Sequence, residues 1–174
     1  MIIRSLIFAV LILTSLGVRG QHDKKAQQHQ QKEARYQQLQ ALVESGQYVF
    51  SGRFALPQKG RQVDLSSRPN YLRIKGREAE ASLPYFGVAY NSSGYGSGGG
   101  AGINFTGVTE GYKVEENKKK YRLMVSFRVR GERESYTCRL IISGAENALL
   151  SVTGTNRQPI SYKGSIAALT DDKD

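Results

Sequence analysis

Alternating apolar and polar side chains over residues 121–142 constrain the fold of this chain more than any other feature. Between 121 and 130 the apolar side chains occupy every second position, a period typical of a half-buried β-strand. These positions are Tyr121, Leu123, Val125, Phe127 and Val129. A turn at 131–132 then predicts a hairpin whose second strand, 136–142, has the same period. Its inward positions include Cys138, which we therefore expect to be buried.

Shorter stretches of the same kind continue through the rest of residues 47–169. One covers 47–57, with its larger apolar face formed by Tyr48, Phe50, Phe54 and Leu56. The others cover 71–75, 78–83, 85–90, 103–108, 112–115, 148–153 and 160–162. We therefore predict a mainly β fold, an antiparallel β-barrel or sandwich of about 8–10 short strands preceded by one N-terminal α-helix. The pattern does not choose between barrel and sandwich.

Two segments precede the β domain. Residues 1–20 begin with a short cationic stretch, continue with an apolar run and end with small residues at a possible cleavage site. This pattern predicts a cleavable signal peptide. No cysteine follows the predicted cleavage site, so the lipid of bacterial lipoproteins would have no attachment point. Residues 21–46 are rich in Gln and predict a helix that ends at Gly46. We expect a periplasmic or secreted protein, with no stable membrane insertion after cleavage and a disordered acidic tail at 170–174.

The charge of the chain indicates its partners. The sequence has 25 Lys and Arg against 15 Asp and Glu, a net charge of +10, which falls to +8 when Arg4 and Arg19 leave with residues 1–20. Outside the cytosol the available polyanions are anionic glycans, lipid head groups and acidic surfaces of envelope proteins. We expect a partner of one of these three kinds, and no nucleic acid.

Several kinds of catalytic centre lack their residues in this chain. The only histidines, His22 and His29, lie in the Gln-rich segment. The β domain therefore has no histidine for a Ser-His-Asp triad, for activation of Cys138, or for a catalytic zinc site. Residues 94–99 match the GxGxxG dinucleotide fingerprint, but a predicted strand follows them where that motif requires a helix. We expect no metal and no cofactor.

A pair of carboxylates is the remaining catalytic candidate. Glu78 and Glu80 project from the same strand face, about 7 Å apart, and inverting glycosidases use pairs at such separations. Glu78 follows Arg77 beside a turn and is expected to be solvated, whereas a catalytic acid is usually held in an apolar pocket. We therefore assign no catalytic residue.

Arginines and tyrosines are the candidates for ligand binding. Four arginines should share the polar face of the long hairpin, where guanidinium groups can hold carboxylate or phosphate; they are Arg122, Arg128, Arg130 and Arg139. The alternative interpretation is a solvated strand face. Tyr90 and Tyr95 belong to a Gly-rich loop, and Gly with Tyr gives a pliable contact surface.

Two motifs carry a resemblance to a known family. They are LPYFG at 83–87, followed by VAY, and NRQPISYKG at 156–164. Together with the signal peptide, the polar helix and the Gly-rich stretch, they resemble the secreted bacterial family, common in Bacteroidetes, that is catalogued as domain of unknown function 4251. The resemblance covers residues 47–168 and implies an exported β domain, with no catalytic residue to transfer.

The two motifs also have a physical interpretation. Tyr85 and Phe86 should point to opposite faces, one into the core and one outward. Arg157 could stack on the exposed ring while Asn156 caps the turn through its amide, forming a latch between the last strand and the middle of the sheet. The alternative is a ligand site that includes Tyr85, Asn156 and Arg157.

Three functions fit these observations. The first is a non-enzymatic binding module for an envelope component or partner protein. The second is a small-barrel carrier of an apolar or amphipathic ligand, and the third is a carboxylate-based glycan hydrolase. A closed barrel with a lined cavity would favour the carrier, whereas a filled core with an exposed aromatic patch would favour the binding module.

Overall fold

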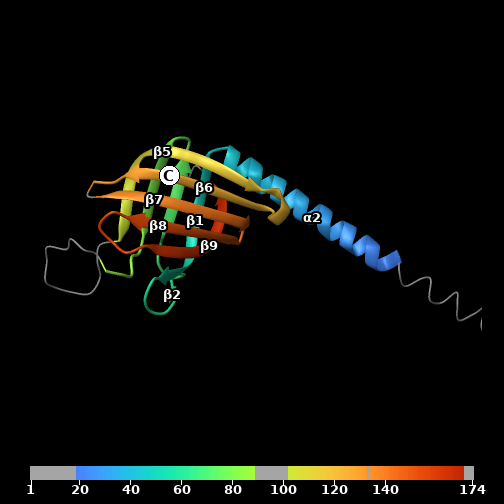
Figure 1. Ribbon diagram of the computed structural model, residues 1–174, viewed down its shortest axis with the longest axis horizontal. Helices are drawn as coiled ribbons and strands as arrows, with labels where there is room; N and C mark the ends of the chain where they lie inside the picture. Colours follow the sequence, from blue (N-terminus) through green and yellow to red (C-terminus); the bar gives the residue numbers. More distant parts are fainter. Residues whose placement is uncertain (1–18, 89–101, 133, 171–174) are drawn as a thin grey trace, which may run out of the picture. The chain divides into compact units, whose positions relative to one another are not determined.

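Eight antiparallel strands close into a barrel within residues 38–174, a unit distinct from residues 1–37. The computed structural model describes residues 19–88, 102–132 and 134–170 of the chain (Figure 1). The prediction of a mainly β fold preceded by one helix is confirmed, and of the two alternatives the fold is the barrel.

Helix α2 (Arg19–Glu44) comes first, and nine strands and one short 3₁₀ helix follow it among the described residues. The strands are β1 (Gln47–Pro57), β2 (Val63–Asp64), β3 (Tyr71–Lys75), β4 (Glu78–Leu83), β5 (Ile103–Asn117), β6 (Arg122–Arg130), β7 (Ser135–Gly144), β8 (Asn147–Gly154) and β9 (Ile160–Ala168). The 3₁₀ helix η1 (Lys118–Lys120) connects β5 to β6. From β3 to β9 each strand pairs with its neighbours in sequence order, as Figure 1 shows for β5 to β9.

Strand β1 closes the barrel because it pairs on both sides. One side pairs with β3 through residues 47–50 and then with the two-residue strand β2. The other side pairs with the last strand, β9, along the whole of β1. Between β3 and β2 the side chain of Asn70 replaces a partner strand: it accepts from the Gly52 N–H at 2.8 Å and donates to the Gly52 carbonyl at 2.9 Å.

The barrel interior is filled by the inward side chains of the alternating strands. In β6 and β7 these are the positions that the sequence pattern predicts, from Leu123 to Val129 and from Tyr136 to Ile142, and all of them are buried. Cys138 lies among them with no exposed surface. Tyr48, Phe50 and Tyr162 add large rings from β1 and β9. Burial of this continuous apolar set is the main source of the barrel's stability.

The alternation predicted for 47–57 is wrong beyond Gly52. The register with β9 shifts between Gly52 and Phe54, so Arg53 is an extra residue on β1. Such a bulge moves the following side chains to the other face of the sheet. Ala55 therefore points into the core, while Phe54 and Leu56 are only half-buried.

The structure also corrects the predicted strands around β5. The stretches 103–108 and 112–115 form one strand, which bends at a bulge where Gly111 has a φ of 62°. Tyr121, predicted as the first inward residue of β6, instead ends η1 with a left-handed backbone at φ 49° and is half-buried. Residues 85–88, predicted to begin a strand, are outside any strand.

The helix agrees with its prediction near its C-terminus. It ends at Glu44, and Gly46 follows with a φ of 64° as a glycine cap. Tyr36, Leu39 and Val43 are buried, while the described side chains before Tyr36 are exposed. None of the helices in the described part of the chain is long and apolar enough to cross a membrane.

A substitution at Gly164 tests the importance of barrel closure. Gly164 of β9 lies opposite Gly52 of β1, and a Cβ at Gly164 would overlap the Ser51 carbonyl oxygen. We expect Gly164→Ala to lower the free energy of unfolding by about 3 kcal/mol, because backbone atoms must separate to make room. Urea unfolding followed by circular dichroism would measure the change.

Gly144→Ala is the matched control for Gly164→Ala. Gly144 ends strand β7, and a Cβ there would meet only the Cβ of Asn147 at 3.7 Å, an ordinary contact. We expect this control to stay within about 1 kcal/mol of wild type. Equal stabilities for the two variants would show that the β1–β9 crossing tolerates a side chain.

Candidate functional site

A buried ion pair lies at the barrel end that carries the β6–β7 and β8–β9 connections. Glu134, just before β7, pairs with Arg157, which lies between β8 and β9. Their side chains keep 3% and 12% of their surface exposed. Arg157 Nε donates to Glu134 Oε1 at 2.6 Å, and Arg157 Nη2 contacts the same oxygen. A carboxylate this deeply buried needs such a partner.

Further donors complete the hydrogen bonding of Glu134. The Tyr136 hydroxyl donates to Oε1 at 3.0 Å, and the backbone N–H of Asn156 donates to Oε2 at 3.2 Å. The expectation that Asn156 caps its turn through the side-chain amide is therefore replaced by a contact of its backbone. The carboxylate, rather than Asn156, organises this turn.

Two tyrosine rings enclose the Arg157 guanidinium. Its central carbon lies 4.8 Å from the ring centroid of Tyr85 and 5.7 Å from that of Tyr136, both within cation–π range. The sequence predicts stacking on an exposed ring, but Tyr85 is buried and Phe86 is half-buried. Arg157 thus stacks on the ring that belongs to the core.

Hydrogen bonds join the LPYFG segment to the NRQPISYKG segment. The Tyr85 hydroxyl lies 3.1 Å from the carbonyl oxygen of Gln158, and the Tyr162 hydroxyl donates to the Pro84 carbonyl at 2.8 Å. The Gln158 N–H donates to the Val88 carbonyl at 3.1 Å. The two motifs are in contact, as the latch interpretation predicts, and we call this cluster the rim latch: Tyr85, Glu134, Tyr136, Asn156 and Arg157.

Glu134 is the member of the rim latch whose role is not indicated by the sequence pattern around it. The preceding residues Glu132 and Arg133 and the following Ser135 are all polar, so the local pattern indicates an exposed turn. Only the burial of Arg157, in a different connection, gives this carboxylate its role. A lone arginine in a buried motif is the signal that could have prompted a search for an acidic partner.

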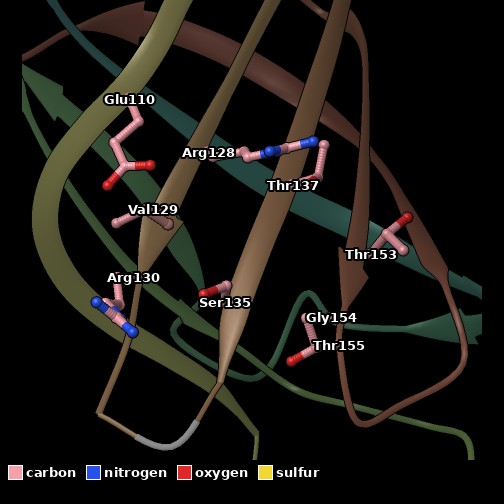
Figure 2. A pocket seen from close by; sticks show the side chains of 9 residues that line it. All are labelled: Glu110, Arg128, Val129, Arg130, Ser135, Thr137, Thr153, Gly154 and Thr155. Carbon is pink, nitrogen blue, oxygen red and sulfur yellow. The ribbon is translucent and has the colours of Figure 1, made fainter.

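A groove on the outer face of the barrel is the second candidate site. It crosses β5 to β8, has a volume of about 430 Å³, and is lined mainly by outward polar side chains (Figure 2). We call it the outer groove; its lining residues are Glu110, Arg128, Val129, Arg130, Ser135, Thr137, Thr153, Gly154 and Thr155. It is open to solvent, unlike the packed interior.

Strand register explains why these side chains meet. Arg128 pairs with Thr137, and Thr137 pairs with Thr153, so a guanidinium and two hydroxyls form a row across three strands. Glu110 continues this row on β5. One step along, Arg130 pairs with Ser135. Figure 2 shows Arg128 extending over β7 to Thr137, whereas the Arg130 side chain extends to the other side of its strand.

The four predicted hairpin arginines separate into two groups. They share the outer face as expected, but only Arg128 and Arg130 line the outer groove. Arg122 donates to the Ser143 hydroxyl at 3.2 Å. A hydrogen bond and electrostatic attraction from Lys113 are the main causes that lower the pKa of the Glu115 carboxyl, and Arg139 adds a smaller electrostatic attraction. Among the described residues, neither Arg128 nor Arg130 has an ion-pair partner.

The structure places the remaining predicted site residues elsewhere. Tyr90 and Tyr95 lie outside the described residues. Glu80 accepts a hydrogen bond from the Tyr71 hydroxyl at 2.6 Å and pairs with Arg73 at 3.6 Å on the outer surface. Glu78 is exposed beside the β3–β4 turn. Within the described residues, no group of three or more His, Cys, Asp or Glu side chains could hold a metal ion.

Burial raises the pKa values of several ionisable groups of the interior, and two of them are Cys138 and Tyr136. Burial raises the pKa of the Cys138 thiol to about 12, and burial is also the main cause that raises the pKa of Tyr136 to about 12. Both groups are neutral at physiological pH. Because the thiolate is the reactive form of cysteine, Cys138 acts as a small apolar side chain.

Comparison with known proteins gives a family and a fold. Residues 30–166 match the family described as a domain of unknown function, DUF4251. A crystal structure of a DUF4251 family protein from Bacteroides eggerthii is similar, with a TM-score of 0.60 and 20% sequence identity, covering 78% of this chain and 88% of that one. No curated protein matches the chain significantly. At this identity the crystal structure is evidence of a shared fold.

The rim latch predicts a large effect of neutralising Glu134. Glu134→Gln leaves Arg157 buried opposite a neutral amide, and we expect a loss of about 3 kcal/mol in unfolding free energy. Glu146→Gln is the control, because Glu146 pairs with Arg53 at 3.6 Å and both side chains are more than half exposed. That variant should change stability by less than about 0.5 kcal/mol. Similar urea midpoints for both variants would contradict the proposed importance of the buried pair.

Because the Cys138 thiol is buried, we expect the free energy of unfolding to fall at alkaline pH. The thiol ionises near pH 9 in the unfolded chain and near pH 12 when folded, so unfolding releases a proton in this interval. Stability attributable to Cys138 is therefore complete below pH 9 and falls, by up to about 1.4 kcal/mol per pH unit, as pH rises through the interval. Chemical unfolding at several pH values should give a shallower decline for Cys138→Ala. Identical slopes would mean that the thiol does not titrate differently on unfolding.

Proposed function

The chain belongs to the DUF4251 family, a domain of unknown function, and we propose that it is an exported, non-enzymatic binding module whose outer groove holds an anionic envelope component. Arg128 and Arg130 carry this proposal. They are two guanidinium groups in one groove, without ion-pair partners among the described residues. Guanidinium groups bind carboxylate and phosphate oxygens through charge-assisted hydrogen bonds.

The net charge of the chain supports an anionic partner. At +8 after loss of residues 1–20, the protein attracts polyanions over a long range, and the groove adds a defined place for contact. The N-terminal pattern of residues 1–20 supports export, and therefore a partner in the cell envelope or outside the cell.

The filled interior favours a binding module over a carrier. A carrier would need a lined cavity inside the barrel, but large side chains such as Tyr48, Phe50 and Tyr162 are fully buried there. The described groove lies on the outer face instead. A hydrolase gains no support either, because Glu80 is engaged with Tyr71 and Arg73 on an exposed strand face.

A polymer that carries carboxylates but no hydroxyls tests the proposed function. We expect a fluorescently labelled polyacrylate oligomer to bind the full chain at low ionic strength, as measured by fluorescence anisotropy. Arg128→Gln and Arg130→Gln should each weaken binding about tenfold, because each removes a charge-assisted contact.

Arg122→Gln is the matched control. Arg122 lies on the same strand face, and its replacement removes the same charge, but it does not line the groove. We expect its affinity to remain close to wild type. Equal losses in all three variants would show non-specific attraction by net charge, and absence of binding would refute the proposed function.

A further inference from the structure

We propose, on the basis of the proposed binding function, that the outer groove recognises an acidic oligosaccharide, a glycan that carries carboxylate groups beside free hydroxyls. Such a ligand needs cationic groups for its carboxylates, together with hydrogen-bond donors and acceptors for its hydroxyls. The outer groove contains these chemical groups at fixed positions.

The groove hydroxyls supply both donors and acceptors. Ser135, Thr137, Thr153 and Thr155 line the groove, and none of these hydroxyls has a hydrogen-bond partner among the described residues. Ser151 and Ser161, outside the groove on the same face, instead bond to each other at 2.9 Å. A hydroxyl both donates and accepts, so each unpaired one can match a sugar hydroxyl.

The spacing of these groups fits an extended ligand. Arg128, Thr137 and Thr153 occupy neighbouring strands, so their row spans about 10 Å at the usual strand separation. Arg130 belongs to the next row, and Figure 2 shows its guanidinium directed away from Arg128. Diverging guanidiniums suit a chain with repeated carboxylates better than one compact anion.

Glu110 favours a saccharide over a simple anion. Its carboxylate lines the groove in the same row as Arg128, where it would repel a phosphate group. A carboxylate can, however, accept hydrogen bonds from sugar hydroxyls. A ligand that combines negative groups with hydroxyl donors can use both ends of this row.

The surroundings of the groove argue against an acidic peptide. Extended peptides bind sheets at free strand edges, where backbone groups are unpaired. The groove lies on the faces of β6, β7 and β8, and each of these strands pairs with neighbours on both sides. Recognition there must use side chains.

The surroundings also argue against a membrane surface. Among the described residues, the exposed large apolar side chains are Val88, Val108 and Val114, and none of them lines the groove. A lipid-binding face usually combines basic residues with inserted apolar side chains. Besides its two arginines, the outer groove is lined by hydroxyls, one carboxylate, Gly154 and Val129, and the Val129 side chain is buried and therefore not available for insertion into a lipid layer.

Isothermal titration calorimetry on the full chain tests whether the outer groove prefers an acidic oligosaccharide. The probes are oligogalacturonate, oligoalginate and a hyaluronan fragment, compared with a polyacrylate oligomer of matched carboxylate number. We expect at least one uronate oligosaccharide to bind about tenfold more tightly than polyacrylate, because hydroxyl contacts add to charge. The double substitution Thr137→Val and Thr153→Val should remove this gain and leave polyacrylate affinity unchanged.

Thr106→Val is the control for the hydroxyl variant. Thr106 is an exposed threonine of β5 outside the groove, and its substitution should leave the affinity for each probe unchanged. Circular dichroism would establish that the double variant is folded. A second control, methyl-esterified oligogalacturonate, keeps hydroxyls and loses charge, so its binding should be much weaker.

The possible results separate this inference from the proposed function. If polyacrylate binds in an Arg128-dependent manner and none of the three saccharides binds more tightly, the inference of an acidic oligosaccharide is overturned. The proposed anion-binding function of the groove then still stands. Tighter Arg128-dependent binding to phosphatidylglycerol vesicles or to hexaglutamate would overturn it in favour of a lipid or a peptide. Failure of every probe to bind would refute both proposals.

Discussion

The pairing of the first strand with the last is the constraint on which the rest of the structure depends. Strand β1 must pair with β9 on one side and with β3 and β2 on the other, and only then does the sheet have no long open edge. This double role explains the irregular middle of β1. Gly164 of β9 permits the close approach of the Ser51 carbonyl of β1. Gly52 leaves room for the Asn70 side chain, which satisfies the backbone groups of Gly52 where no strand lies beside them.

The rim latch solves a related problem at one barrel end. Connections there bring together polar groups that cannot all reach water, and an uncompensated carboxylate would be costly. Glu134 instead receives donors from Arg157, Tyr136 and Asn156. The family motifs thus have a structural explanation, because they supply the tyrosine, the arginine and the backbone contacts that surround one buried charge.

Local patterns predicted the strands and much of the core, while features that depend on distant pairing escaped prediction. The burial of Cys138 followed from alternation within its own hairpin. The positions of Phe54 and Leu56 did not follow from alternation, because the bulge at Arg53 arises only when β1 pairs with the distant strand β9. The sequence predicted one part of the outer groove, because alternation places Arg128 on an outer face. Only the register between strands brings Thr137 and Thr153 beside it. The role of Glu134 was missed because its partner lies in another connection.

Gly154 links the two sites, and this has a kinetic consequence. It lines the outer groove, and a Cβ there would come within 2.5 Å of a Glu134 oxygen, so the buried ion pair lies directly behind this wall. The groove therefore acquires its shape during folding, before any ligand arrives. The proposed ligand would meet a preorganised wall, and little conformational entropy would be lost there on association. Capture would then depend on the rate of encounter and orientation, and the lifetime of the complex on the contacts formed.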